Sequence, residues 1–270
     1  MKIAFLGGGN MASALIGGLI AKGTDARSIS VIEMAPAARE KLGARYPIHL
    51  STAPDAAMQG SDVLVLAVKP QDMRKALASL ATSVNGKLVV SVAAGITIKS
   101  LASWLGGHRK IVRCMPNTPA LIGAGITGLF ASPEVEKKER EAAETILRAV
   151  GDVVWMPEER LLDPVTAVSA SGPAYVFWFI EQLAASAVQL GIPKDAALKM
   201  AKQTVLGSAM LASQSADSPE TLRKNVTSKG GTTEAALKVF DEAKLAEHFA
   251  RAVAAASKRG EEMGREFGGD

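Results

Sequence analysis

Three small residues near the N-terminus have the spacing of a phosphate-binding turn. Gly7, Gly9 and Ala12 follow a short apolar run, Ile3–Leu6, and precede a helical pattern. In a strand–turn–helix unit the first glycine permits the tight bend and the second lets a pyrophosphate approach the backbone. The small third residue allows the helix to pack closely on the strand. The turn is therefore predicted to bind a nicotinamide dinucleotide, with contacts from Gly7, Gly9, Asn10, Met11 and Ala12.

An acidic residue stands about 20 residues further on, where a carboxylate accepts a hydrogen bond from the adenosine ribose. This residue is Glu33, which ends the second predicted strand. A carboxylate there repels a 2′-phosphate and favours NAD over NADP. Three cations, Lys22, Arg27 and Arg39, are near in sequence, so the choice between reduced NAD and reduced NADP stays open.

Two other predicted strand ends could contact the same ligand. A doubly wound sheet binds its ligands at the carboxyl ends of its strands. Residues 67–70 end one strand, and Lys69 would bring a mobile cation to the crevice, although a plain surface lysine is the alternative. Residues 91–95 end another strand in small side chains that leave space for a flat nicotinamide. The contacts expected from these segments are Ala67, Val68, Lys69, Pro70, Ala93 and Ala94.

A second glycine-rich stretch, residues 228–233, could hold a small anion. One helix is predicted to end before it and another to begin in it, with Thr232 and Thr233 as candidate N-caps. The free amides of a helix start suit a small carboxylate, and the hydroxyl groups can donate or accept hydrogen bonds. A capped turn between two helices explains the same pattern without a ligand.

Arg113 and Asn117 flank a proline-rich loop after a further strand. Both side chains could line the crevice. A structural ion pair for Arg113 and an Asx-turn for Asn117 explain the two residues equally well.

The elements that must position these residues alternate between strands and helices over the first half of the chain. The run 62–68 is continuously apolar after Asp62, as a strand covered on both faces requires. The alternation predicts a doubly wound, mostly parallel α/β sheet with right-handed crossovers. The expected strands are 2–6, 30–33, 62–68, 87–93, 110–115, 125–130 and 152–156, and the expected helices are 11–22, 37–44, 71–81, 98–105 and 134–150.

The pattern changes near residue 160, beyond which only helices are expected. We therefore predict two domains, 1–160 and 161–270, the second all-helical. The stretch 175–180 is apolar all round, which is typical of a helix buried on all sides. In so small a domain this burial indicates a second subunit. The expected helices are 173–190, 193–213, 219–226, 233–240 and 244–267.

The composition argues against several classes of function. Among 270 residues, 31 basic and 27 acidic side chains are interspersed, without the basic stripe and aromatic residues that nucleic-acid binding requires. No apolar run reaches the length of a membrane span. The single cysteine, Cys114, cannot form a disulfide within the chain, which fits a cytoplasmic location. The histidines His49, His108 and His248 lie outside every motif, and no metal site is predicted.

Taken in order, the motifs resemble those of the pyrroline-5-carboxylate reductase family. The most specific is a Gly-Gly-x-Thr core that follows a serine and precedes an Ala-Leu helix. The resemblance covers essentially the whole chain and implies a Rossmann domain followed by an all-α dimerisation domain. In this family the helical domains interlock in a homodimer, and dimers often form rings. The matching segments are 7–12, 67–70, 91–95, 113–119, 169–175 and 225–237.

The resemblance implies reduction of 1-pyrroline-5-carboxylate to proline, the last step of proline synthesis. By similarity, the second glycine-rich loop holds the substrate carboxylate, and the Thr233 hydroxyl lies near the ring nitrogen as the catalytic group. The partner subunit supplies the cofactor. The substrate contacts implied in this way are Ser228, Gly230, Gly231, Thr232 and Thr233.

Two positions depart from the family pattern, and two other functions remain open. Ala170 stands where many relatives have glycine, and Glu33 stands where relatives often carry serine or arginine for NADP. A related imine reductase or β-hydroxyacid dehydrogenase would usually have a lysine in a long helix after the boundary, whereas 181–189 has none. A non-catalytic dinucleotide-binding regulator would have no reason to keep the Gly-Gly-Thr-Thr loop.

Overall fold

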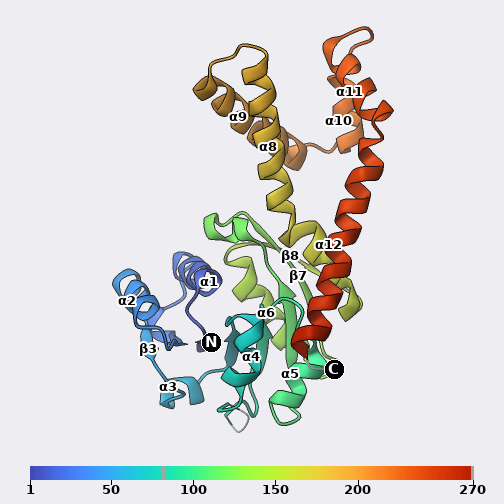
Figure 1. Ribbon diagram of the computed structural model, residues 1–270. Helices are drawn as coiled ribbons and strands as arrows, with labels where there is room; N and C mark the ends of the chain where they lie inside the picture. The colour runs from blue at the N-terminus through green and yellow to red at the C-terminus, as the bar shows by residue number, and fades with distance from the viewer. Residues whose placement is uncertain (81–82, 269–270) are drawn as a thin grey trace. The chain divides into compact units, whose positions relative to one another are not determined.

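The computed structural model describes residues 1–80 and 83–268 (Figure 1). Contacts between residues divide the chain into two compact units. The first is Met1–Ser171 together with Ala255–Asp270, and the second is Gly172–Ala254. The division into domains 1–160 and 161–270 stays a prediction. Each unit is described by itself below.

The first unit is built on one sheet, in which the described residues form eight strands in the order β3-β2-β1-β4-β5-β6-β7-β8. The described strand pairs are parallel except for the antiparallel pair β6–β7. The predicted doubly wound, mostly parallel sheet is thus confirmed. The strands are β1 Ile3–Leu6, β2 Ile29–Ile32, β3 His49–Ser51, β4 Val63–Leu66, β5 Leu88–Ser91, β6 Ile111–Met115, β7 Gly125–Ala131 and β8 Gly151–Trp155.

The central strands are continuously apolar because successive side chains enter two different cores. Ile3 and Phe5 of β1 belong to one buried cluster, whereas Ala4 and Leu6 belong to another. Side chains of α1 and α6 complete the first cluster, and those of α4 and α5 complete the second. This period of two explains why both faces of the sheet are covered. The covering helices are α1 Asn10–Ala21, α2 Pro36–Arg45, α3 Ala56–Gln59, α4 Pro70–Leu77, α5 Ile98–Trp104 and α6 Lys137–Arg148.

Several predicted boundaries differ from the structure. The helix expected at 71–81 ends at Leu77, and its last predicted residue, Ala81, lies outside the described residues. The helix expected at 134–150 begins only at Lys137, because the side chains of Glu136 and Glu139 form a reciprocal cap at its start. The sequence patterns missed β3 and α3.

A short helical segment, α7 Leu162–Val165, precedes the second unit and was not predicted. It continues into one π-helical turn over Thr166–Ala170, in which the Ser171 amide donates to the Thr166 carbonyl at 2.9 Å. Ala170, the position at which many relatives have glycine, lies in this turn.

The second unit is helical, as predicted. The stretch of α8 that is apolar on all sides remains exposed to solvent in the single chain. Phe177 and Trp178 are 59% and 58% exposed. The expected burial on all sides is therefore not met within the single chain. The helices are α8 Gly172–Gln189, α9 Lys194–Gln214, α10 Pro219–Asn225, α11 Thr232–Glu242 and α12 Leu245–Gly268.

The second half of α12 belongs to the first unit. Phe267 packs against the cluster that contains α4 and α5, and Figure 1 traces α12 to its end beside α5. Among the described residues, no helix has the length and hydropathy needed to cross a bilayer.

Candidate active site

The N-terminal turn lies where β1, β2 and β4 end side by side. The Gly7 amide donates to the Ile32 carbonyl at 2.8 Å, and the Ala67 amide donates to the Leu6 carbonyl at 2.8 Å. Gly7 has a φ of +96°, and a Cβ there would lie 2.8 Å from the Ala67 oxygen. Only glycine fits this position, because the turn passes directly over the end of β4.

Gly9 has a different role, since it is the N-cap of α1 in extended conformation (φ −68°, ψ −171°). A Cβ at Gly9 would meet no atom within 4 Å, so packing of the polypeptide does not demand a glycine here. The open side of the residue leaves the first amides of α1 accessible to an anion. Asn10 is exposed at the start of the helix, and Ala12 is fully buried against the sheet. The turn thus fits the pyrophosphate of a dinucleotide.

The other predicted cofactor residues occupy the ends of β4 and β5. Lys69 is exposed and is the N-cap of α4, with Pro70 as the first helical residue. Ala93 is buried and donates its amide to the Ser91 hydroxyl at 3.4 Å, whereas Ala94 is half-buried. The structure therefore brings the segments 67–70 and 91–95 to the same edge of the sheet as the N-terminal turn.

Glu33 directly follows β2, and both of its carboxylate oxygens are bonded to the backbone. One oxygen accepts the Gly8 amide at 2.7 Å, and the other accepts the Ala35 amide at 2.8 Å. The carboxylate is thereby tied to the middle of the glycine-rich turn, as a ribose-binding acid requires.

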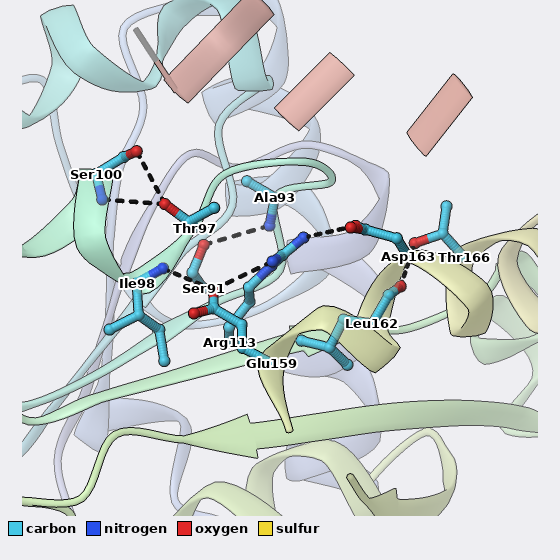
Figure 2. A network of polar contacts seen from close by, with 10 residues as sticks. All are labelled: Ser91, Ala93, Thr97, Ile98, Ser100, Arg113, Glu159, Leu162, Asp163 and Thr166. Carbon is cyan, nitrogen blue, oxygen red and sulfur yellow. Dashed lines mark hydrogen bonds and ion pairs between the residues drawn. The ribbon is translucent and has the colours of Figure 1, made fainter. Parts of the chain in front are cut away.

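A buried ionic network braces the loop that follows β5 (Figure 2). Arg113 of β6 donates to Glu159 at 3.1 Å and to Asp163 at 3.2 Å, and its side chain is 6% exposed. The Glu159 oxygen also accepts the Ile98 amide at 2.7 Å, at the start of α5. Arg113 is thus a structural cross-link and does not line a crevice. The sequence patterns missed Glu159 and Asp163, whose only signal was two acids one helical turn apart.

Asn117 also has a structural role, but forms no Asx-turn of the kind considered from sequence. Its side-chain nitrogen donates to the Ser169 carbonyl at 3.1 Å, and its side-chain oxygen accepts the Ile126 amide at 3.0 Å. These bonds tie the loop after β6 to β7 and to the π-helical turn.

The second glycine-rich loop differs from the predicted arrangement in one respect. Gly231, not a threonine, is the N-cap of α11, so Thr232 and Thr233 are its first two residues. Gly230 adopts a φ of +73°, and its amide donates to the Glu234 carboxylate at 2.6 Å. The predicted threonine caps are wrong because a glycine takes the extended cap position and a glutamate at the third helical position reaches back.

This placement directs the threonines toward a hollow of about 910 Å³ within the second unit. Its other walls are mostly apolar, and Tyr175 and Phe249 meet there edge to face with ring centres 6.0 Å apart. The first amides of α11 have no acceptor within the helix, so the loop offers an anion-binding helix start beside an apolar surface. The lining residues from α8, α9 and α11 include Phe179, Leu183, Val205, Thr232, Thr233 and Ala236.

Two of the three histidines, His49 and His108, have a local partner or are partly buried. His49 contacts Asp55 at 2.6 Å, and this bond lowers the pKa of the Asp55 carboxyl. Burial lowers the pKa of the His108 imidazole. The described residues contain no cluster of three or more histidine, cysteine or acidic side chains that could hold a metal ion.

We predict that Cys114 is inert toward thiol reagents in the folded protein. The thiol is 1% exposed and donates to the Ser91 carbonyl at 3.1 Å, and burial raises its pKa well above the ordinary value. A raised pKa lowers the thiolate fraction at pH 8, and the thiolate is the reactive form. Titration with a chromogenic disulfide should give no reaction under native conditions and one thiol per chain in denaturant. Rapid native labelling would contradict the buried position.

Known proteins match this chain over nearly its whole length. Residues 2–95 match the family model described as NADP oxidoreductase coenzyme F420-dependent, and residues 159–263 match pyrroline-5-carboxylate reductase dimerisation. A pyrroline-5-carboxylate reductase of Pseudomonas aeruginosa is 41% identical over 268 residues, which are 99% of this chain and 98% of that protein.

Solved structures agree with this result. A pyrroline-5-carboxylate reductase from Coxiella burnetii has a TM-score of 0.93 and 40% identity, covering 97% of this chain and 98% of that one. The Plasmodium falciparum pyrroline carboxylate reductase, solved with NADP bound, has a TM-score of 0.85 and 27% identity over 98% of both chains. Because relatives with 40% and 41% identity match nearly the whole length, the chain belongs to the pyrroline-5-carboxylate reductase family.

Proposed function

We propose that the protein reduces the C=N bond of 1-pyrroline-5-carboxylate to give L-proline, with reduced NAD or NADP as the hydride donor. One observation carries this assignment beyond the dinucleotide turn. The start of α11 presents free amides and the hydroxyls of Thr232 and Thr233 to an apolar hollow, which suits a small ring that carries a carboxylate. The names of the full-length relatives support the same reaction.

A bound reduced nicotinamide supplies the hydride. The chain's own part begins with the open N-terminus of α1 at Gly9, which binds the pyrophosphate through backbone amides. Glu33 accepts a hydrogen bond from a ribose hydroxyl, and Lys69 adds a positive charge at the end of β4. The small residues Ala93 and Ala94 leave room for the nicotinamide ring. In the proposed assignment Gly7, Asn10, Met11, Ala12, Ala67, Val68 and Pro70 complete the cofactor contacts.

The substrate carboxylate is held by the loop at 228–233, with Ser228, Gly230 and Gly231 shaping it. The Thr233 hydroxyl donates one hydrogen bond to the ring nitrogen of the neutral imine, or accepts one from the N–H of the protonated imine. A cyclic imine has a pKa near neutrality, so much of it arrives already protonated and a strong general acid is unnecessary. Most of the rate enhancement then comes from holding the two reacting carbons at about 3–3.5 Å.

Thr233→Ala is therefore expected to slow turnover by about 10- to 100-fold without abolishing it, which corresponds to roughly 1.4–2.7 kcal/mol. Steady-state kinetics with pyrroline-5-carboxylate measure the effect. Thr233→Ser is the matched control, because it keeps the hydroxyl and should retain most of the activity. Complete loss of activity in a correctly folded Thr233→Ala variant would contradict the weak-donor role.

We further propose that the protein is a homodimer or a ring of dimers. Support comes from the open apolar stretch of α8, where Val176, Phe177, Trp178 and Phe179 are each 45–59% exposed. A surface of that kind is typical of an interface between subunits. Light scattering should give at least twice the 28.1 kDa mass of the chain.

The lone, unpaired cysteine supports a cytoplasmic location.

The decisive experiment mixes purified protein, pyrroline-5-carboxylate and either NADH or NADPH, and follows absorbance of the reduced cofactor. Oxidation that depends on both protein and imine, with proline as product, is the expected result. A β-hydroxyacid and a larger cyclic imine are the comparison substrates, which test the related dehydrogenase and imine reductase activities. If neither NADH nor NADPH is oxidised, the proposed reaction is rejected.

A further inference from the structure

The adenosine end of the proposed cofactor site carries a fixed negative charge. Glu33 is half-buried at the end of β2, and its two oxygens accept the Gly8 and Ala35 amides at 2.7 and 2.8 Å. Two hydrogen bonds to one carboxylate hold it in a single position at the edge of the turn. A carboxylate has about four lone-pair sites, so acceptor capacity remains for a ribose hydroxyl.

Each of the three cations that are near Glu33 in sequence has a hydrogen-bond partner within the protein. Arg39 donates from one guanidinium nitrogen to the carbonyls of Glu33 and Met34, at 2.9 and 2.8 Å. Arg27 pairs with Asp25 at 2.9 Å, and Lys22 donates to the Arg148 carbonyl. Lys22 and Arg27 thus point to other partners. Arg39 bonds to the two carbonyls through Nη1 alone and lines the hollow at the ends of β2 and β3, so its Nε and Nη2 remain as donors beside Glu33.

The space beside Glu33 can accommodate an adenosine. The Glu33 amide donates to the Ser51 carbonyl at 3.0 Å, which joins the carboxyl ends of β2 and β3. An open hollow of about 940 Å³ lies at these strand ends and includes Pro36, Ser51, Thr52 and Ala53 in its walls. A free 2′-hydroxyl in this place would donate to Glu33, whereas a 2′-phosphate would bring like charge against an anion that cannot move away.

We infer that this chain selects NADH over NADPH and that Glu33 is the residue that discriminates between them. The inference rests on the proposed function, and it differs from the NADP-bound state of the Plasmodium relative. The preference arises from the anion that the backbone fixes at the edge of the turn, with Lys22 and Arg27 bonded to other groups.

Calorimetric titration of the substrate-free protein with NADH and with NADPH tests the inference without relying on turnover. We expect the wild-type protein to bind NADH at least about tenfold more tightly. Glu33→Gln removes the charge with little change in shape, and Glu33→Ser also removes the bulk. Both variants should move the ratio of the two dissociation constants toward NADPH by at least about tenfold. Glu141→Gln, which removes an exposed carboxylate from α6, should change the ratio less than about twofold.

The outcomes separate the two proposals. Equal or tighter binding of NADPH by the wild-type protein would overturn the inference whether or not the variants fold. An unchanged ratio in folded Glu33→Gln would also overturn it, because the charge would then have no effect. Preferential NADH binding without imine-dependent oxidation would uphold the inference and reject the reaction. Faster oxidation of NADPH than of NADH would uphold the reaction and reject the inference.

Discussion

Gly9→Ala is expected to weaken dinucleotide binding at least about tenfold while leaving the unfolding midpoint unchanged. The backbone at Gly9 is extended, at φ −68° and ψ −171°, so alanine can adopt it without strain. The added methyl group meets no protein atom within 4 Å. It would instead occupy the space through which a pyrophosphate approaches the amides of α1. Calorimetry with the reduced cofactor and urea unfolding measure the two quantities separately.

Gly7→Ala is the matched comparison, and we expect it to reduce stability as well as binding. Gly7 has a φ of +96°, and its Cβ would lie 2.8 Å from the Ala67 oxygen and 2.9 Å from a Val68 methyl carbon. Left-handed backbone costs about 1–3 kcal/mol and overpacking a further 1–3 kcal/mol, so the free energy of unfolding should fall by about 2–6 kcal/mol. Equal stability losses in the two variants would show that Gly9 is also structural and would contradict its assignment to the ligand.

The sheet could be predicted from sequence because its central strands carry a strong local signal. In β1, β4 and β5 successive residues are all buried, since alternate side chains enter two cores. The edge strand β3 lacks that signal. His49, Leu50 and Ser51 are exposed or half-buried, and their pairing with β2 defines the strand. The four residues of α3 are too few to show a helical period.

In the candidate site, too, the features set by residues close in sequence could be predicted, and those set by residues far apart in sequence could not. The N-terminal turn could be predicted because the roles of Gly7 and Gly9 are set by the strand and the helix that adjoin them in sequence. Nearness in sequence was misleading for the cations around Glu33, since Lys22 bonds to Arg148, which is 126 residues away. The threonine caps failed for a local reason, because glycine competes well for the cap position when a glutamate follows at the third helical residue.

Arg113→Met is expected to lower the free energy of unfolding by about 3–5 kcal/mol. The Arg113 side chain is 6% exposed, and those of its partners Glu159 and Asp163 are 27% and 19% exposed. Methionine fills a similar volume but leaves both carboxylates without their cation in a poorly solvated place (Figure 2). Urea unfolding followed by circular dichroism measures the loss. Since Glu159 also accepts the Ile98 amide, the start of α5 should lose protection from hydrogen exchange.

Arg109→Met is the control, because Arg109 pairs with Glu134 on the surface with 74% of its side chain exposed. Such a pair contributes about 0–1 kcal/mol, so the two arginine variants separate burial from the mere presence of an ion pair. The triple variant Arg113→Met, Glu159→Gln, Asp163→Asn should recover part of the loss, because it removes the stranded charges along with the cation. A triple variant as unstable as Arg113→Met would contradict this reasoning. The instability would then come from lost packing or from the lost attraction itself, rather than from two acids left without a partner.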